Sequence, residues 1–175
     1  AVRPPWWRWL VAAYPLAAVA AFAITLLPGP SNDPEVRFKG AGGFRVAVLP
    51  AGSAEPKLIA HDARVKAGDS LRFQWEGTES GHLLVLERDG TGATSVFWPF
   101  GAASSGPVAA NARAFLPGSV ELDDAPGPEW LVAVFSPKPL AAGPLLDALR
   151  GDPNAAPTVS CEGCTVQSIR LLKER

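Results

Sequence analysis

The stretch HLLVLERDGTGATSVFWPF, residues 82 to 100, decides the fold, because it holds two strand-length apolar runs and the turn between them. HLLVLERD (82 to 89) and TSVFWPF (94 to 100) have the length and composition of buried strands. Between them, Asp89-Gly90-Thr91-Gly92 supplies residues that tolerate positive φ, as a tight hairpin requires. The Gly-Thr-Gly pattern differs from a dinucleotide loop, which would carry a third glycine and open a helix. We therefore predict an antiparallel hairpin.

Runs of the same kind recur along the chain, each bounded by turn residues. They are FRVAVL (44 to 49), SLRFQW (70 to 75), FLPGSVELD (115 to 123) and EWLVAVFS (129 to 136). LAAGPLLDALR (140 to 150) predicts a short helix that ends at Gly151, and VQSIRLLK (166 to 173) predicts an edge or returning strand. The fold class expected is mainly β with one short helix, as an antiparallel β-sandwich or a rolled sheet.

The N-terminal part has a different pattern, because no charged side chain occurs between Trp9 and Leu27. At about 1.5 Å per residue, such a helix spans roughly the 30 Å hydrocarbon layer of a bilayer. Aromatic and basic residues that fit the membrane interface precede it: Arg3, Trp6, Trp7, Arg8 and Trp9. The prolines that follow Leu27 end the helix.

We therefore expect a single transmembrane helix in a bacterial inner membrane, with a cytoplasmic N-terminus and a periplasmic C-terminal domain. The expected division is a cytoplasmic flank (1 to 8), the span (9 to 27), a linker (28 to 39) and an extracytoplasmic β-rich domain (40 to 175). A signal peptide cleaved near Ala21-Phe22-Ala23 is the nearest alternative, and a buried core helix is a further one. The chain starts at Ala1, so we also expect that an N-terminal part precedes it.

The composition fits one anchor and one modest domain within 175 residues. The formal net charge is -1 and no Lys/Arg-rich run is present, which argues against a nucleic-acid partner. The lipid bilayer and a protein in or outside the membrane are the expected partners, and no cofactor is expected.

The candidate catalytic residues form no recognisable catalytic motif, so we expect that the protein is not an enzyme. His61 and His82 belong to no zinc-protease motif and no nucleophile elbow, and a surface turn and a strand edge are their expected places. Ser104 or Ser105 would need a general base close in space to act as a nucleophile, and the sequence gives no evidence of one. Asp123-Asp124 is expected to cap a turn, because a calcium loop needs more oxygen ligands at regular positions.

Cys161-Glu162-Gly163-Cys164 is the sharpest chemical signal in the chain. In an oxidising compartment we expect the two cysteines to form a local disulfide. Two alternatives stay open: half of a zinc site completed by the histidines, and a thioredoxin-like motif, which would have to open a helix. We expect no metal.

The aromatic run Phe97-Trp98-Pro99-Phe100 predicts a binding surface at Trp98 and Phe100. Neighbouring residues of a regular strand point to opposite faces, so we expect that Phe97 and Trp98 do not face the same core. An outward Trp98 would anchor a partner. The alternative is that the helix covers this second face of the sheet.

The order of LLVLERDGTGATSVFWPFG, FLPGSVELDDAPGPEWLVAVFS, a short helix and a last strand resembles a bacterial family. This is the extracytoplasmic β-rich domain found behind zinc-finger anti-sigma-like modules and serine/threonine kinases. The likeness covers roughly residues 40 to 175 and implies a sensory or protein-interaction domain of a signalling regulator. It implies no catalytic residues, and the family's metal-binding head is not part of this sequence. The alternative function is an accessory structural subunit of a larger membrane complex.

Overall fold

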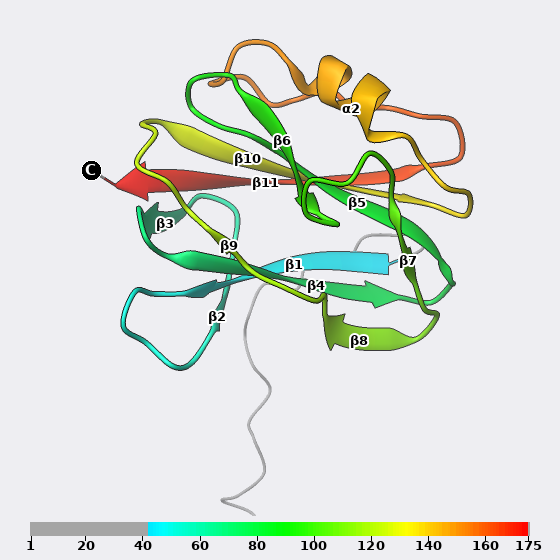
Figure 1. Ribbon diagram of the computed structural model, residues 1–175, viewed down its shortest axis with the longest axis horizontal. Helices are drawn as coiled ribbons and strands as arrows, with labels where there is room; N and C mark the ends of the chain where they lie inside the picture. Colours follow the sequence, from blue (N-terminus) through cyan, green and yellow to red (C-terminus); the bar gives the residue numbers. More distant parts are fainter. Residues whose placement is uncertain (1–41, 175) are drawn as a thin grey trace, which may run out of the picture. The chain divides into compact units, whose positions relative to one another are not determined.

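The computed structural model describes residues 42 to 174 of the chain (Figure 1). The expected membrane-interface residues, the span at 9 to 27 and the linker lie outside the described residues, as does the start of the domain at residue 40. Within the described part, the structure contains no helix with the length and apolar character needed to cross a bilayer.

Two sheets form the domain, and the first has the strand order β2-β1-β4-β8, with β9 also paired to β4. Its strands are β1 (Gly42–Leu49), β2 (Lys57–Ile59), β4 (Ser70–Gly77), β8 (Ala112–Phe115) and β9 (Val120–Glu121). All of these pairings are antiparallel.

The second sheet has the order β3-β11-β10-β5-β6, with β7 also paired to β5. Its strands are β3 (Ala63–Lys66), β5 (Gly81–Arg88), β6 (Thr94–Trp98), β7 (Gly106–Val108), β10 (Pro128–Ser136) and β11 (Thr165–Glu174). β3 runs parallel to β11, and the other pairings are antiparallel.

The main core lies between the two sheets (Figure 1). On β4 every second residue is buried, so that Leu71, Phe73 and Trp75 face inward. β5 and β10 are buried on both faces, because the helix α2 (Ala142–Leu149) covers the outer face of the second sheet. These two strands therefore read as continuous apolar runs rather than alternating ones.

The expected mainly β fold with two sheets and a short helix is confirmed. The hairpin at residues 89 to 93 is also present, since the carboxylate of Asp89 accepts backbone N–H groups from Thr91 at 2.8 Å and Ala93 at 2.9 Å. Gly92 has the positive φ of 87°. Gly90 is needed for another reason: a Cβ there would lie 1.9 Å from the backbone oxygen of Pro126.

One strand expectation is wrong in detail. Residues 115 to 123 do not form one strand, because Pro117 and Gly118, whose φ is 89°, turn the chain between β8 and β9. The last strand, β11, returns antiparallel beside β10, and β3 pairs with the other side of its residues 171 to 174. The short strands β2, β3 and β7 have too few apolar residues to stand out in the sequence.

The expectation that Phe97 and Trp98 face different sides is also wrong. A β-bulge shifts the register between β5 and β6, so that Val85 pairs with Trp98 and Leu86 pairs with Val96. Phe97 is the extra residue, and both aromatic rings pack against the core between the sheets. The helix covers the other face at Val96, as the alternative interpretation proposed.

Candidate functional site

Polar side chains form a row across the inner face of the second sheet, near one end of the sandwich. Glu87 on β5 lies opposite Ser95 on β6 and opposite Leu131 on β10. Leu131 faces the core, and Glu129 is two residues away from it on the same strand, so Glu87 and Glu129 share the inner face. Lys173 on β11 extends the row.

The two glutamates of this row are buried, with exposed fractions of 6% for Glu87 and 2% for Glu129. Ser95 donates a hydrogen bond from Oγ to Oε2 of Glu87 at 2.9 Å. The side chain of Lys173 is 3% exposed and its Nζ contacts Oε1 of Glu129. The same Nζ lies 2.7 Å from Oδ1 of Asp123. The row is therefore a connected network of charged and polar groups.

Burial, followed by the contact with the carboxyl group of Glu129, raises the pKa of Glu87 to about 9. Glu87 is therefore protonated at neutral pH. Burial also raises the pKa of Glu129, against the opposing effects of Glu87 and Lys173. Burial lowers the pKa of Lys173, but hydrogen bonds to Asp123 and Glu129 outweigh it and the net pKa is raised.

The position of the proton follows from these contacts. Glu87 holds an acid proton at neutral pH, and its contact with Glu129 is that of a donor to an acceptor. A single proton between the two carboxyl groups therefore relieves their repulsion. Oε2 of Glu129 is buried and has no hydrogen-bond partner.

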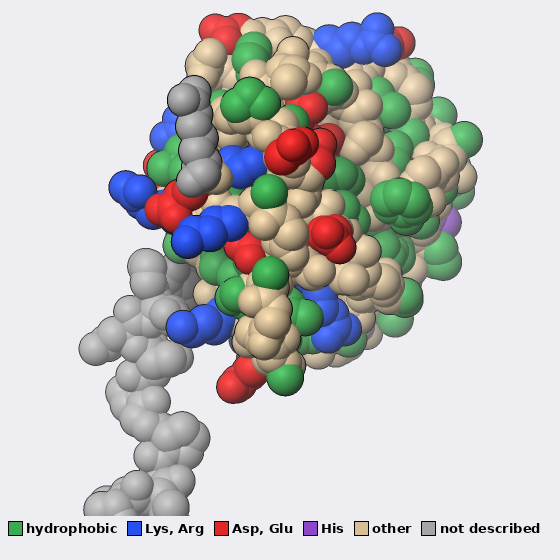
Figure 2. All heavy atoms as spheres, turned by 60° about the vertical axis from the view of Figure 1, so that its left-hand side comes forward, with side chains coloured by type: hydrophobic (Ala, Val, Ile, Leu, Met, Phe, Trp, Pro, Cys, Tyr) green, Lys and Arg blue, Asp and Glu red, His purple; other side chains and the backbone are tan. Residues whose placement is uncertain are grey.

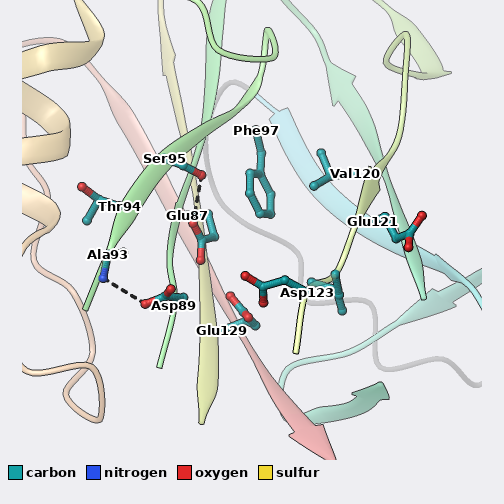
Figure 3. Close-up of a pocket in the computed structure, with 11 residues that line it drawn as sticks. Glu87, Asp89, Ala93, Thr94, Ser95, Phe97, Val120, Glu121, Asp123 and Glu129 are labelled. Carbon is teal, nitrogen blue, oxygen red and sulfur yellow. Dashed lines mark hydrogen bonds between the residues drawn. The ribbon is translucent and has the colours of Figure 1, made fainter. Parts of the chain in front are cut away.

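A pocket of about 230 Å³ opens beside this pair (Figure 3). Figure 3 shows the carboxyl groups of Glu87, Asp123 and Glu129 turned toward one another, with the ring of Phe97 beside them. The lining residues are Glu87, Asp89, Ala93, Thr94, Ser95, Phe97, Val120, Glu121, Leu122, Asp123 and Glu129. Figure 2, in which the left-hand side of Figure 1 comes forward, shows both acidic and basic side chains on this face.

The residues that the sequence singled out for binding lie elsewhere. Trp98 is half-buried and lines a second pocket of about 200 Å³ together with Trp75 and Phe115. Phe100 is 80% exposed. The described residues give no test of binding at Trp98 or Phe100, and that prediction stays open.

The cysteines and histidines take the places that the sequence indicated. Cys161 and Cys164 form a disulfide with their Cα atoms 5.4 Å apart, and they pack beside the helix-covered core. His61 is on the surface, where Nδ1 accepts the backbone N–H of Arg170 at 3.2 Å. His82 is half-buried at the start of β5. Among the described residues, no group of three or more His, Cys, Asp or Glu is placed to hold a metal ion.

Asp123 caps a turn as expected, since Oδ1 accepts the backbone N–H of Ala125 at 3.1 Å. Its pairing with Lys173 was missed, and so were the roles of Glu87 and Glu129. A signal existed: Glu129 lies at every second position with the core residues Leu131 and Ala133, so it is on the same face of the strand. When both faces of a strand are buried, the alternation of residues does not show which face meets the other sheet, so the signal was ambiguous.

Comparison with protein-family models, curated proteins and solved structures gives no match to this chain.

Proposed function

We propose that this chain is a membrane-anchored, extracytoplasmic binding domain that serves a bacterial signalling regulator as its sensory part. The observation that carries the proposal is the pocket at the end of the sandwich, where buried ionisable groups meet exposed ones. Buried carboxyl groups with strongly shifted pKa values are costly to a fold and concentrate at functional sites. The uncharged run at residues 9 to 27 supports the membrane anchor.

Binding fits this pocket better than turnover does. Ser95 is the hydroxyl in contact with Glu87, but a carboxyl group that already holds a proton at neutral pH is not a base for that hydroxyl. Neither His61 nor His82 lines the pocket. Catalysis would need a nucleophile with a free base within reach, whereas recognition needs only shape and a few fixed polar groups.

The location can be tested with protease added to spheroplasts that express the full chain. The proposal predicts that the described domain is digested before the cells are lysed. Survival of the domain until lysis contradicts it.

The binding role can be tested in the same membranes with a photo-crosslinking amino acid at Glu121, which is exposed and lines the pocket. The matched control places it at Lys57, an exposed residue of β2. We expect an adduct with a signalling partner or small ligand from Glu121 and none from Lys57. Equal labelling at the two positions contradicts a role for the pocket.

A further inference from the structure

We propose that the pocket between β5, β6, β9 and β10 binds a small organic cation, whose ammonium group replaces the proton shared by Glu87 and Glu129. This inference rests on the proposed binding function and names the ligand class. Three features of the described residues support it: an oxygen atom that lacks a donor, the sign of the charge around the pocket, and the mixture of polar and apolar walls.

The oxygen atom is Oε2 of Glu129, which is buried, lies in a lining residue and has no conventional hydrogen-bond donor. The other oxygen of this carboxylate is held by Lys173. A buried carboxylate oxygen without a donor is costly, so the site is arranged for one more N–H or O–H group.

The charge around the pocket favours a cation. Five lining residues are acidic, namely Glu87, Asp89, Glu121, Asp123 and Glu129, and none of the described lining residues is Lys or Arg. Lys173 lies behind the pair and its Nζ is already engaged by two carboxylates. An anionic ligand would find no cation available in the pocket, whereas an ammonium group would find several acceptors.

The remaining walls favour an organic cation over a metal ion. Phe97, Val120 and Leu122 also line the pocket, and an aromatic face attracts an ammonium group as well as its alkyl chain. A hard divalent cation prefers six or more oxygen ligands, and no described group is placed to hold a metal. The volume of about 230 Å³ is below the range of about 300 to 1,000 Å³ typical of drug-sized ligands, so the ligand is small.

The exchange balances in charge. One ammonium ion enters, Glu87 releases its proton to the solvent, and the two carboxylates accept N–H groups from the ligand. The other charged groups around the pair are Asp89 after β5, Glu121 on β9, Asp123 after β9 and Lys173 on β11, and the carboxyl group of Glu121 points away from the pair (Figure 3). Binding therefore releases one proton and becomes tighter as pH rises.

The test is a titration of the full 175-residue chain in a non-ionic detergent with n-butylammonium chloride. Calorimetry in two buffers of different ionisation enthalpy gives the number of protons released. Amide NMR shifts locate the site. We expect saturable binding, shifts centred on Ser95, Phe97 and Val120, and release of about one proton. Between pH 6.5 and 8.5 the Kd should fall by about tenfold per pH unit.

The variant is Glu87→Gln, because a glutamine amide can donate to Glu129 as the protonated acid does. It keeps the contact but has no proton to release. We expect Kd at pH 8 to rise at least about tenfold and to become independent of pH. Glu79→Gln, which removes an exposed carboxylate in the turn between β4 and β5, is the matched control and should bind as the native chain does.

The inference is overturned if the native chain shows no saturable binding of n-butylammonium. It is also overturned if the amide shifts lie away from the pocket, if binding releases no proton, or if calcium binds at these residues in place of the ammonium ion. These results do not depend on Glu87→Gln folding. If the n-butylammonium titration gives a negative result while protease digestion and crosslinking at Glu121 succeed, the proposed function stands and the ligand class is wrong. If the described domain is protected in spheroplasts, the proposed function itself falls.

Discussion

Glu87 and Glu129 lie diagonally across two neighbouring antiparallel strands, because Glu87 pairs with Leu131 and not with Glu129 itself. The offset brings the two carboxyl groups into contact on the inner face of the sheet, where both are buried. Two ionised carboxylates in contact would repel each other strongly, so the pair retains a proton. This relationship makes the pocket sensitive to pH.

Replacing Glu87 with glutamine should make the stability of the domain less dependent on pH. The folded-state pKa of Glu87 is about 9, above the ordinary value of 4.5. The folded state therefore holds a proton that the unfolded state has lost, and stability decreases as pH rises between these values. This group contributes a slope of up to about 1.4 kcal/mol per pH unit.

Urea denaturation at several pH values between 5 and 9 measures the effect. The native chain should lose stability as pH rises, and Glu87→Gln should lose less and exceed it at pH 8.5. Parallel curves for the two proteins would show that Glu87 titrates normally in the folded state.

Lys173→Met should destabilise the domain by about 3 kcal/mol at pH 7, because it leaves the buried Glu129 carboxylate without a cation. The loss should be smaller at pH 5, where Glu129, whose pKa is already raised, is more easily protonated. The control is Lys66→Met: that lysine is 70% exposed and pairs with Glu174 at 3.6 Å, so its removal should cost below about 1 kcal/mol. Equal losses in the two variants would contradict a structural role for the buried pair.

Replacing both Cys161 and Cys164 with serine should cost about 2 kcal/mol or less, because a bond between residues three apart restricts only a short loop of the unfolded chain. Thermal unfolding with and without reductant measures the difference. Thiol titration of natively purified protein should find no free thiol. Two free thiols would show that the disulfide is absent in the cell.

Trp98→Ala and Phe100→Ala should act differently. Trp98 packs against the core, so its truncation should lower stability by about 2 to 3 kcal/mol. Phe100 is 80% exposed, so Phe100→Ala should change stability by less than about 0.5 kcal/mol. If Phe100 is a partner contact, crosslinking in membranes should weaken in Phe100→Ala while the unfolding midpoint stays unchanged. Unchanged crosslinking would remove Phe100 from the binding surface.

The parts of the fold that could be predicted from the sequence are those with long apolar runs. The runs that contain Val46, Phe73, Leu84 and Val132 gave four strands, since each places several residues in the core. The hairpin followed from the turn chemistry of Asp89 and Gly92. The bulge at Phe97 was not predictable, because it depends on the register between two strands and not on local composition.

The candidate site was harder to predict, because its residues are far apart in the sequence. Glu87, Glu129 and Lys173 come from three strands that meet only in the folded sheet. Each alone resembles an ordinary charged residue at the end of an apolar run. Asp123 was identified as a turn residue, and nothing local in the sequence indicated that it lines the pocket or contacts Lys173.

NMR titration of the Glu87 side-chain carboxyl carbon in the full chain, with and without n-butylammonium chloride, tests both the shared proton and the cation site. We predict a midpoint near pH 9 without the cation, and a midpoint at least about one unit lower when the cation saturates the site. A midpoint near 4.5 that the cation does not move would contradict both the shared proton and the binding site.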